Sequence, residues 1–373
     1  METYRLSSKV TEDNKEFVIQ TSNDAKIGSV LSYVYVNGKL TESSKLPHPI
    51  EFSSEEILTL VKSFHEDKKT EIELMLKAFK SAREEGSPEM LSKLGAAFFY
   101  KGFITEAQDL LHTAISIDSE NDFAYSILAR TEIETERYDL AVKYAHHTVE
   151  MKPAYPDYHY HLGVAHLFNG NGKQAGKEFS EAAKINLYYA DAYFGMGLAL
   201  ILNAIQQDEK KLFTNILSNS REFIKKAAAI DPDYETDIFN EGIKALDISS
   251  LETAFNLFKK VYYLKKEKRN SQLASYYMKF VYSQNDLSDT TITNRMEYLK
   301  SELGKNPDFA DLHSEISFCY MNRAKNSLHE AVKHYQKALN INPSLTSVEK
   351  NLEDITEQLK QFSEILSKIT IKG

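Results

Sequence analysis

Small and large apolar residues recur at a constant interval of about 34 residues through the middle of the chain. The pair Leu94-Gly95 is followed in this register by Leu128-Ala129, Leu162-Gly163 and Met196-Gly197. Small residues recur in the same register at Ala107, Ala141 and Ala175, and at Ala114, Thr148 and Ala182. Small residues let two helices cross closely, and large residues fill the space between them. The pattern therefore predicts helix–turn–helix units at 88–121, 122–155 and 156–189.

Beyond residue 190 the period becomes irregular. A fourth unit begins at Ala190, but its closing proline, Pro232, lies 11 residues beyond the strict period, since two repeat steps from Pro153 lead to 221. We expect the extra residues, around 206–219, to lengthen both helices of this unit and their connection. Weaker units are predicted at 235–268 and 270–307, and a last one ends at Pro343 with extra residues in its turn near 325–327. About seven units thus fill 88–343, irregularly from 206 to 307.

The two ends of the chain follow other patterns. Before residue 50, β-branched and aromatic residues gather at 16–21 and 30–36, and Asn37-Gly38 supplies a two-residue hairpin turn. We expect a small antiparallel meander of three strands in 1–50, leaning on a helix or a neighbouring chain because three strands alone are marginal. Two helices in 51–87 then form an N-terminal cap or an atypical repeat. A last amphipathic helix in 344–373 either caps the final unit or dimerises as a coiled coil.

The repeated Leu-Gly, Ala and closing Pro resemble the pattern of the tetratricopeptide-repeat (TPR) family. The resemblance covers roughly 88–343, strongly in its first third and at its end, and weakly from 206 to 307. It implies a mainly α fold, a right-handed α-solenoid whose concave groove is lined by the first helix of each unit. The groove positions carried over to this sequence are Ser92, Phe99, Phe123, Ser126, Arg130, Tyr160, His161, Val164, Phe168, Phe194, Leu198 and Ile201.

That strip of positions is apolar and aromatic, with few charges. Exposed aromatic area marks interaction surfaces, which favours a groove for an apolar or amphipathic peptide. The alternative is that long helices and neighbouring units bury many of these positions. The Lys, Asn and Arg residues with which TPR co-chaperones hold the C-terminal carboxylate of heat-shock chaperones are not matched by Ser92, Ala96, Ile127, Asp157 and His161. We therefore do not expect that class of ligand.

Charge and cysteine usage narrow the class of partner. The formal net charge is -9, with acids and bases mixed along the chain, which argues against a nucleic-acid partner. One basic run, 265–269, lies between two expected helical segments and is interpreted as a solvated turn. No apolar run is long enough to span a bilayer, so direct membrane insertion is not expected. With one cysteine, Cys319, interpreted as inert and buried, and no signal-peptide pattern, we expect a cytoplasmic location.

The sequence offers no recognisable catalytic set. It contains no Gly-rich phosphate loop, no Gly-x-Ser-x-Gly turn and no His-Glu-x-x-His motif. Histidines gather at His159, His161 and His166, but no acidic residue completes a metal site at helical spacing. Partly buried histidines that replace aromatics are the favoured interpretation, and a pH-sensitive contact is the alternative. We expect no enzyme activity, no cofactor and no metal.

These patterns favour a non-enzymatic adaptor that binds a peptide or helix of a partner protein, of unknown identity, in the concave groove. The alternative is a self-assembling structural scaffold, in which the β-segment or the terminal helices join copies of the chain. An enzyme with an appended repeat array is the weakest hypothesis, because the repeats take up nearly all of the sequence.

Overall fold

The computed structural model describes residues 3–12, 15–49, 51–206, 213–283, 287, 289–305 and 310–369. The chain divides into two compact units, one of Met1–Ser81 with Tyr276–Gly373 and one of Ala82–Ser275. Helices account for 75% of the chain, and a small antiparallel sheet lies at the N-terminus. The expectation of a mainly α protein with about this helix content is confirmed.

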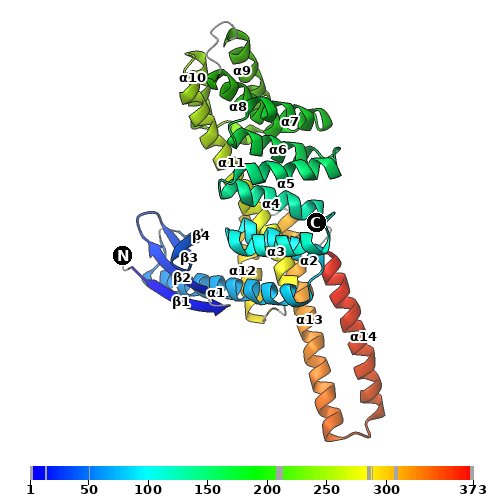
Figure 1. Cartoon of the computed structure of the whole chain (residues 1–373). Helices are drawn as coiled ribbons and strands as arrows, with labels where there is room; N and C mark the ends of the chain where they lie inside the picture. The colour runs from blue at the N-terminus through cyan, green and yellow to red at the C-terminus, as the bar shows by residue number, and fades with distance from the viewer. Residues whose placement is uncertain are drawn as a thin grey trace. The chain divides into compact units, whose positions relative to one another are not determined.

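In the unit of Ala82–Ser275, helices come in pairs, and the first members of successive pairs begin at regular intervals along the sequence (Figure 1). The first helices are α2 (Pro88–Tyr100), α4 (Asp122–Glu134), α6 (Pro156–Phe168) and α8 (Ala190–Gln206). The second helices are α3 (Ile104–Ile117), α5 (Tyr138–Met151), α7 (Gly172–Ile185) and α9 (Phe213–Ile230). Each helix packs against the next, and successive first helices also contact one another. The surface that α2, α4, α6 and α8 share is called the first-helix face below.

Local sequence signals start and space these helices. The Ser87 side chain caps α2 and Pro88 occupies its first turn, while Asn121 caps α4 in the same way as Ser87. Where α6 crosses α7, a Cβ added at Gly163 would lie 2.7 Å from ring carbons of Phe179. Glycine at this position is therefore what allows the two helices to approach so closely.

The fourth pair is longer than the pairs before it, as the sequence predicted. Helix α8 has 17 residues and α9 has 18, compared with 13 in α6 and 14 in α7. Helix α9 is described from Phe213 to Ile230. Residues 207–212, in which part of the expected insertion falls, lie outside the described residues.

The two repeats predicted at 235–268 and 270–307 differ from the expected helix–turn–helix pattern. After η1 (Pro232–Tyr234) and α10 (Asp237–Asp247), helix α11 (Leu251–Ser283) runs for 33 residues without a break. The boundary expected between 235–268 and 270–307 falls inside α11, so a turn there was a wrong prediction. The physical reason is local: no Gly or Pro interrupts 251–283, and its Lys, Glu, Arg and Leu residues are good helix formers.

In the other unit, four antiparallel strands form a meander in the order β1-β2-β3-β4. They are β1 (Arg5–Glu12), β2 (Lys15–Asp24), β3 (Ser29–Val36) and β4 (Lys39–Pro47). Three strands were predicted, and β1 was missed because only Leu6 and Val10 in it are large and apolar and none of its side chains is fully buried. Asn37 and Gly38 have φ values of 49° and 81°, as the predicted two-residue turn requires.

Helix α1 (Ser54–Glu85) packs on the sheet through a small apolar cluster that includes Val30 and Ile57. Behind this cluster, His65 Nδ1 lies 3.0 Å from the Thr21 hydroxyl, which satisfies two buried polar groups. The two helices predicted in 51–87 are one helix of 32 residues. No Gly or Pro lies between the two helices that were predicted, and the polar residues there are compatible with one continuous helix.

The remaining helices of this unit are α12 (Asp289–Lys305), α13 (Ala310–Ile341) and α14 (Thr346–Ile369). Helix α13 packs against both α12 and α14. A turn was expected near 325–327, but α13 is continuous there, and the Asn326 amide donates to the Leu287 carbonyl at 2.7 Å. Along α14, the apolar stripe Val348, Leu352, Ile355, Leu359 and Phe362 is half-buried.

The remaining expectations concern the single cysteine and the hydrophobicity of the helices. Cys319, on α13, is buried with 2% of its surface exposed, as predicted. Among the described residues, none of the helices combines the length and the apolar content that crossing a bilayer would require.

Candidate binding site on the first-helix face

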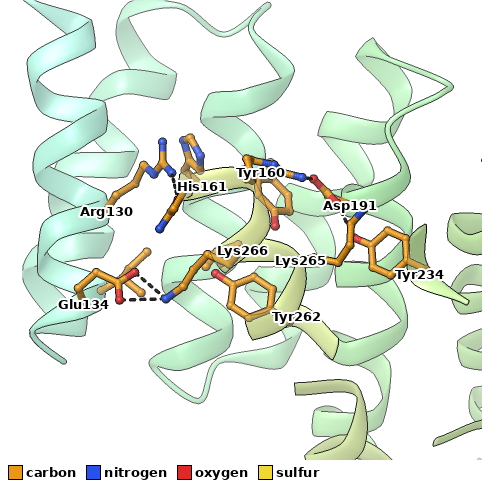
Figure 2. A pocket seen from close by; sticks show the side chains of 13 residues that line it. Arg130, Glu134, Tyr160, His161, Asp191, Tyr234, Tyr262, Lys265 and Lys266 are labelled. Atoms are coloured by element: carbon orange, nitrogen blue, oxygen red, sulfur yellow. Dashed lines mark hydrogen bonds and ion pairs between the residues drawn. The ribbon is translucent and has the colours of Figure 1, made fainter. Parts of the chain in front are cut away.

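The first-helix face is occupied by a helix of the same chain. Helix α11 places Tyr262 against Phe168 of α6, with ring centroids 5.4 Å apart. It also places Asn270 beside α4, where Arg130 Nη2 donates to Asn270 Oδ1 at 3.3 Å. Helix α11 therefore contacts α4, α6 and α8 on the face that the sequence predicted to be open to a peptide (Figure 2).

The basic run 265–269 forms the polar part of this internal contact. Its cations meet carboxylates from other segments: Lys265 meets Asp231 at 2.5 Å, Lys266 meets Glu134 at 2.7 Å, Lys268 meets Asp233 at 2.5 Å, and Arg269 meets Asp191. The interpretation as a solvated turn is wrong, because the run lies within α11 and its charges are paired. Sequence reasoning weighed the run only against its neighbours along the chain, whereas these partners are 34 to 132 residues away.

Most of the predicted groove residues lie in the packed interior. The buried ones are Ser92, Phe99, Ser126, Tyr160, Val164, Phe194, Leu198 and Ile201. The half-buried ones are Phe123, Arg130, His161 and Phe168. Phe194, for example, stacks on Tyr234 with centroids 4.6 Å apart and meets Phe258 edge-on at 5.9 Å. Eight of the twelve predicted groove residues are therefore buried, which is the alternative that the sequence left open.

A charged pocket remains between α4, α6, α8 and α11. It is lined by Arg130, Ile133 and Glu134 of α4, Tyr160, His161 and Val164 of α6, Asp191 of α8, Tyr234 of η1, and Tyr262, Lys265, Lys266, Arg269 and Asn270 of α11. Figure 2 shows Arg130 and His161 side by side at one end, with Asp191 and Tyr234 at the other. Four predicted site residues, Arg130, Tyr160, His161 and Val164, are brought together here.

Arg130 is held in place by aromatic rings rather than by an acid. Its guanidinium carbon lies 5.2 Å from the ring centre of Phe99 and 4.9 Å from that of Tyr100. It donates hydrogen bonds to the Tyr100 hydroxyl and to Asn270 Oδ1. Cation–π contact with two rings and these two hydrogen bonds together fix the position of the guanidinium.

Burial and neighbouring charges set the protonation states in the charged pocket. Burial, with the nearby Arg130 and Arg269, holds the pKa of His161 well below its ordinary value of 6.5, so the ring is neutral at neutral pH. Burial and the carboxylate of Asp191 raise the pKa of the Tyr160 hydroxyl, which therefore stays protonated. The pocket thus combines fixed guanidinium charges with neutral hydrogen-bonding groups.

An apolar pocket lies next to the charged one on the same seam. It is lined by Leu167, Phe168, Gly170, Leu198, Leu202, Phe255, Lys259 and Tyr262. Tyr262 borders both pockets, so they are neighbours along α11. Close by, Tyr263, whose ring centre lies 5.9 Å from that of Phe168, exposes 41% of its surface. Large apolar side chains exposed beside a hollow are typical of interaction surfaces.

His159, also singled out in the sequence, contacts only groups of its own unit in the described part of the chain. His159 is buried, with Nδ1 2.8 Å from Glu178 Oε2 and Nε2 3.0 Å from the Pro153 carbonyl. This matches the interpretation of His159 as a partly buried substitute for an aromatic residue. Within the described part of the chain, no group of three or more His, Cys, Asp or Glu side chains is placed to hold a metal ion.

Sequence reasoning missed the residues that α11 contributes. Tyr262, Lys265, Lys266, Arg269 and Asn270 were assigned to an irregular unit and a turn, and their acidic partners Glu134 and Asp191 were not singled out. One signal was available: the basic run sits in a long segment free of Gly and Pro, which indicates a continuous helix.

Comparisons with known proteins add little beyond this description. No protein-family model matches the sequence. A search of curated proteins likewise gives no match. Among solved structures, one described as the crystal structure of MamA is similar to this chain, with a TM-score of 0.37 and 20% sequence identity, covering 44% of this chain and 92% of that one. An overlap of this size carries no argument about the site.

Proposed function

We propose that this protein is a TPR-like adaptor that binds a segment of a partner protein along the seam between the first-helix face and α11. The observation that carries the proposal is the pair of adjoining pockets on that seam, one charged and one apolar, joined at Tyr262. Such a pair of pockets accepts an apolar side chain and a polar group spaced along one extended or helical segment.

The assignment to TPR-like architecture rests on the helix starts. First helices begin at Pro88, Asp122, Pro156 and Ala190, which are evenly spaced in the sequence, and small residues stand where paired helices cross. Stacked helix pairs of this kind form right-handed solenoids with one concave face. We propose that α2 to α9 form such a solenoid and that the weakly patterned region after it has diverged into the long helix α11.

The proposed binding surface differs from the bare groove expected from the sequence. Phe194, Leu198 and Ile201 are buried, so a partner contacts the half-buried Phe168 and the exposed Tyr263 instead. Lys259 lies over both the Phe168 and Tyr263 rings, at 5.4 and 5.9 Å from their centres, and places a cation at the rim of the apolar pocket. A partner segment with an apolar anchor near an acidic residue suits this surface.

We propose no enzymatic role. The charged pocket contains carboxylates, but each is engaged by a cation: Glu134 by Lys266, and Asp191 by Arg269. Its histidine, His161, is neutral, and the Ser126 hydroxyl lies 3.5 Å from His161 Nδ1, at the limit of a hydrogen bond. The arrangement suits recognition of a polar group better than proton transfer or nucleophilic attack.

A self-assembling scaffold is the second candidate. The observation that favours it is the half-buried apolar stripe of α14, which a second copy of the chain would cover further. Sedimentation velocity over a wide concentration range separates the two candidates. The adaptor sediments as one species at all concentrations, whereas the scaffold grows with concentration.

The adaptor proposal is tested with peptides selected from a random display library on the full chain. Each selected peptide is titrated calorimetrically against the parent protein, Phe168→Ala and Tyr263→Ala. We expect each change to weaken binding on the order of tenfold, because aromatic anchors dominate interfaces of this kind. Tyr188→Ala is the matched control, since Tyr188 is 81% exposed and does not line either pocket. Equal affinities for all four proteins would contradict the proposal.

A further inference from the structure

Arg130 is a cation without a carboxylate partner among the described residues. The charged pocket holds four cations: Arg130, Lys265, Lys266 and Arg269. Three of them form ion pairs: Lys265 with Asp231, Lys266 with Glu134, and Arg269 with Asp191. Arg130 is the cation left over, so this set of groups carries one uncompensated positive charge.

The nearby acids are committed elsewhere. Glu134 lies one turn after Arg130 on α4, yet both of its carboxylate oxygens accept hydrogen bonds from Lys266, at 2.7 and 2.9 Å. Asp191 accepts from Arg269 through one oxygen and from the Tyr234 hydroxyl through the other. Neither acid forms an ion pair with Arg130, and the charge of each is already balanced by another cation.

The surroundings of Arg130 are suited to an incoming anion. Its guanidinium lies over the Phe99 and Tyr100 rings and makes two hydrogen bonds to neutral oxygens, fewer than its N–H groups can make. His161 beside it is neutral, and a neutral imidazole still offers one N–H donor. Planar guanidinium donors match the oxygens of carboxylate and phosphate groups.

We propose that Arg130, with His161 and Asn270, forms an oxyanion site in the charged pocket, which takes one carboxylate or phosphate group. This deepens the proposed function and rests on it for the source of the group, since the partner segment would present the oxyanion while its apolar side chain enters the apolar pocket. The ion pair that Arg130 lacks within its own unit is then completed by the partner.

The site is tested on the full chain with two small probes, inorganic phosphate and acetate, each at constant ionic strength. The readout is the ring signal of His161 in protein labelled at histidine, assigned by its loss in His161→Gln. A bound anion adds a negative charge beside the ring, so the His161 signal shifts saturably and its titration moves to higher pH. The probe that saturates at the lower concentration identifies which oxyanion the site prefers.

Two variants decide whether Arg130 is responsible. Arg130→Gln is expected to weaken the probe that binds by roughly tenfold or more, because a charge-assisted contact is lost. Arg221→Gln removes an arginine that pairs with Asp247 at 3.3 Å on another part of the unit, and should leave binding unchanged. Circular dichroism melts of both variants check that the fold is kept, and Arg130→Lys, which preserves the charge, should bind more weakly than the parent and more tightly than Arg130→Gln.

The outcomes separate this site from the proposed function. No saturable shift with either probe, or an equal shift in the parent and Arg130→Gln, overturns the oxyanion site even where selected peptides still bind. Saturable binding that depends on Arg130 supports the site even where no peptide binds at the seam, in which case the adaptor proposal alone has failed.

Discussion

The ammonium group of Lys266 lies 2.7 Å from Glu134 Oε1, although the two residues are 132 positions apart in the sequence. This contact joins the middle of α11 to the end of α4, and it means that the face expected to receive a partner already holds a helix of its own chain. Recognition is therefore expected at the seam between the two, and the seam's integrity depends on how firmly α11 is held.

The strength of that contact can be measured. Lys266 and Glu134 expose 22% and 30% of their side chains, so the pair is only partly screened by solvent. We expect Lys266→Gln and Glu134→Gln to show a coupling energy of about 0.5–1.5 kcal/mol in a double-mutant cycle, more than a fully exposed pair provides. Urea unfolding of the four proteins gives the value. Lys184 and Glu181, exposed at 67% and 38%, form the comparison pair and should couple more weakly.

Helix crossing is expected to depend on Gly163. A Cβ there would lie 2.7 Å from the Phe179 ring, whereas a Cβ at Gly176 would lie 3.6 Å from the nearest atom, Ala199 Cβ. Gly163→Ala should therefore destabilise by about 1–3 kcal/mol, and Gly163→Leu by at least as much. Gly176→Ala should be neutral or stabilising by up to about 1 kcal/mol, because alanine is the better helix former. Chemical denaturation curves check both, and equal midpoints for the two alanine variants would mean that the crossing is not tight.

Stability should fall with pH in the range where histidines titrate. The pKa of His161 is lowered in the fold, mainly by burial, and the pKa values of His65 and His166 are lowered for the same reason. The unfolded chain then binds protons that the folded chain does not, so the free energy of unfolding decreases as pH falls below about 6.5. His161→Gln removes one contribution, and its unfolding free energy should drop less than the parent's between about pH 7 and pH 5. An equal drop in both proteins would show that folding does not lower the pKa of His161.

Replacing the buried rings of Tyr160 and Phe194 should lower the stability of the fold. The sequence placed Tyr160 and Phe194 in an open peptide groove, where changing both to Ala would weaken partner binding and leave the fold largely intact. Phe194 is 1% exposed and Tyr160 7% exposed, so the double change instead removes packed interior. We expect a loss of at least about 3 kcal/mol of stability, measured by thermal or urea unfolding. A melt like that of the parent would mean that these rings face an open groove.

Regular parts of the fold could be predicted because they depend on short-range repetition. Small residues such as Gly95 and Gly163 repeat in a fixed register, and the helix starts follow the same register. The sheet was recognisable from β2, β3 and the Asn37-Gly38 turn, whereas β1 lacks the buried alternation that reveals a strand. Local propensity and periodicity suffice for such elements.

The candidate site could be predicted only in part. Arg130, Tyr160, His161 and Val164 were found because they stand at repeat positions on first helices. Helix α11 joins these residues in the charged pocket through Lys266 and Arg269. The partners of these two residues are far away in the sequence, so no local pattern predicts the contact. The pairs that fix α11 are acids and bases that look like ordinary surface charges when each is considered alone.

The most direct test of the account is hydrogen–deuterium exchange of the full chain, alone and saturated with a peptide selected on it. We expect exchange to slow in α4, α6, α8 and α11, around Phe168 and Tyr262, and to stay unchanged in β1–β4 and in α13 and α14. Slower exchange confined to the sheet or to α13 and α14, with the first-helix face and α11 unaffected, would contradict it.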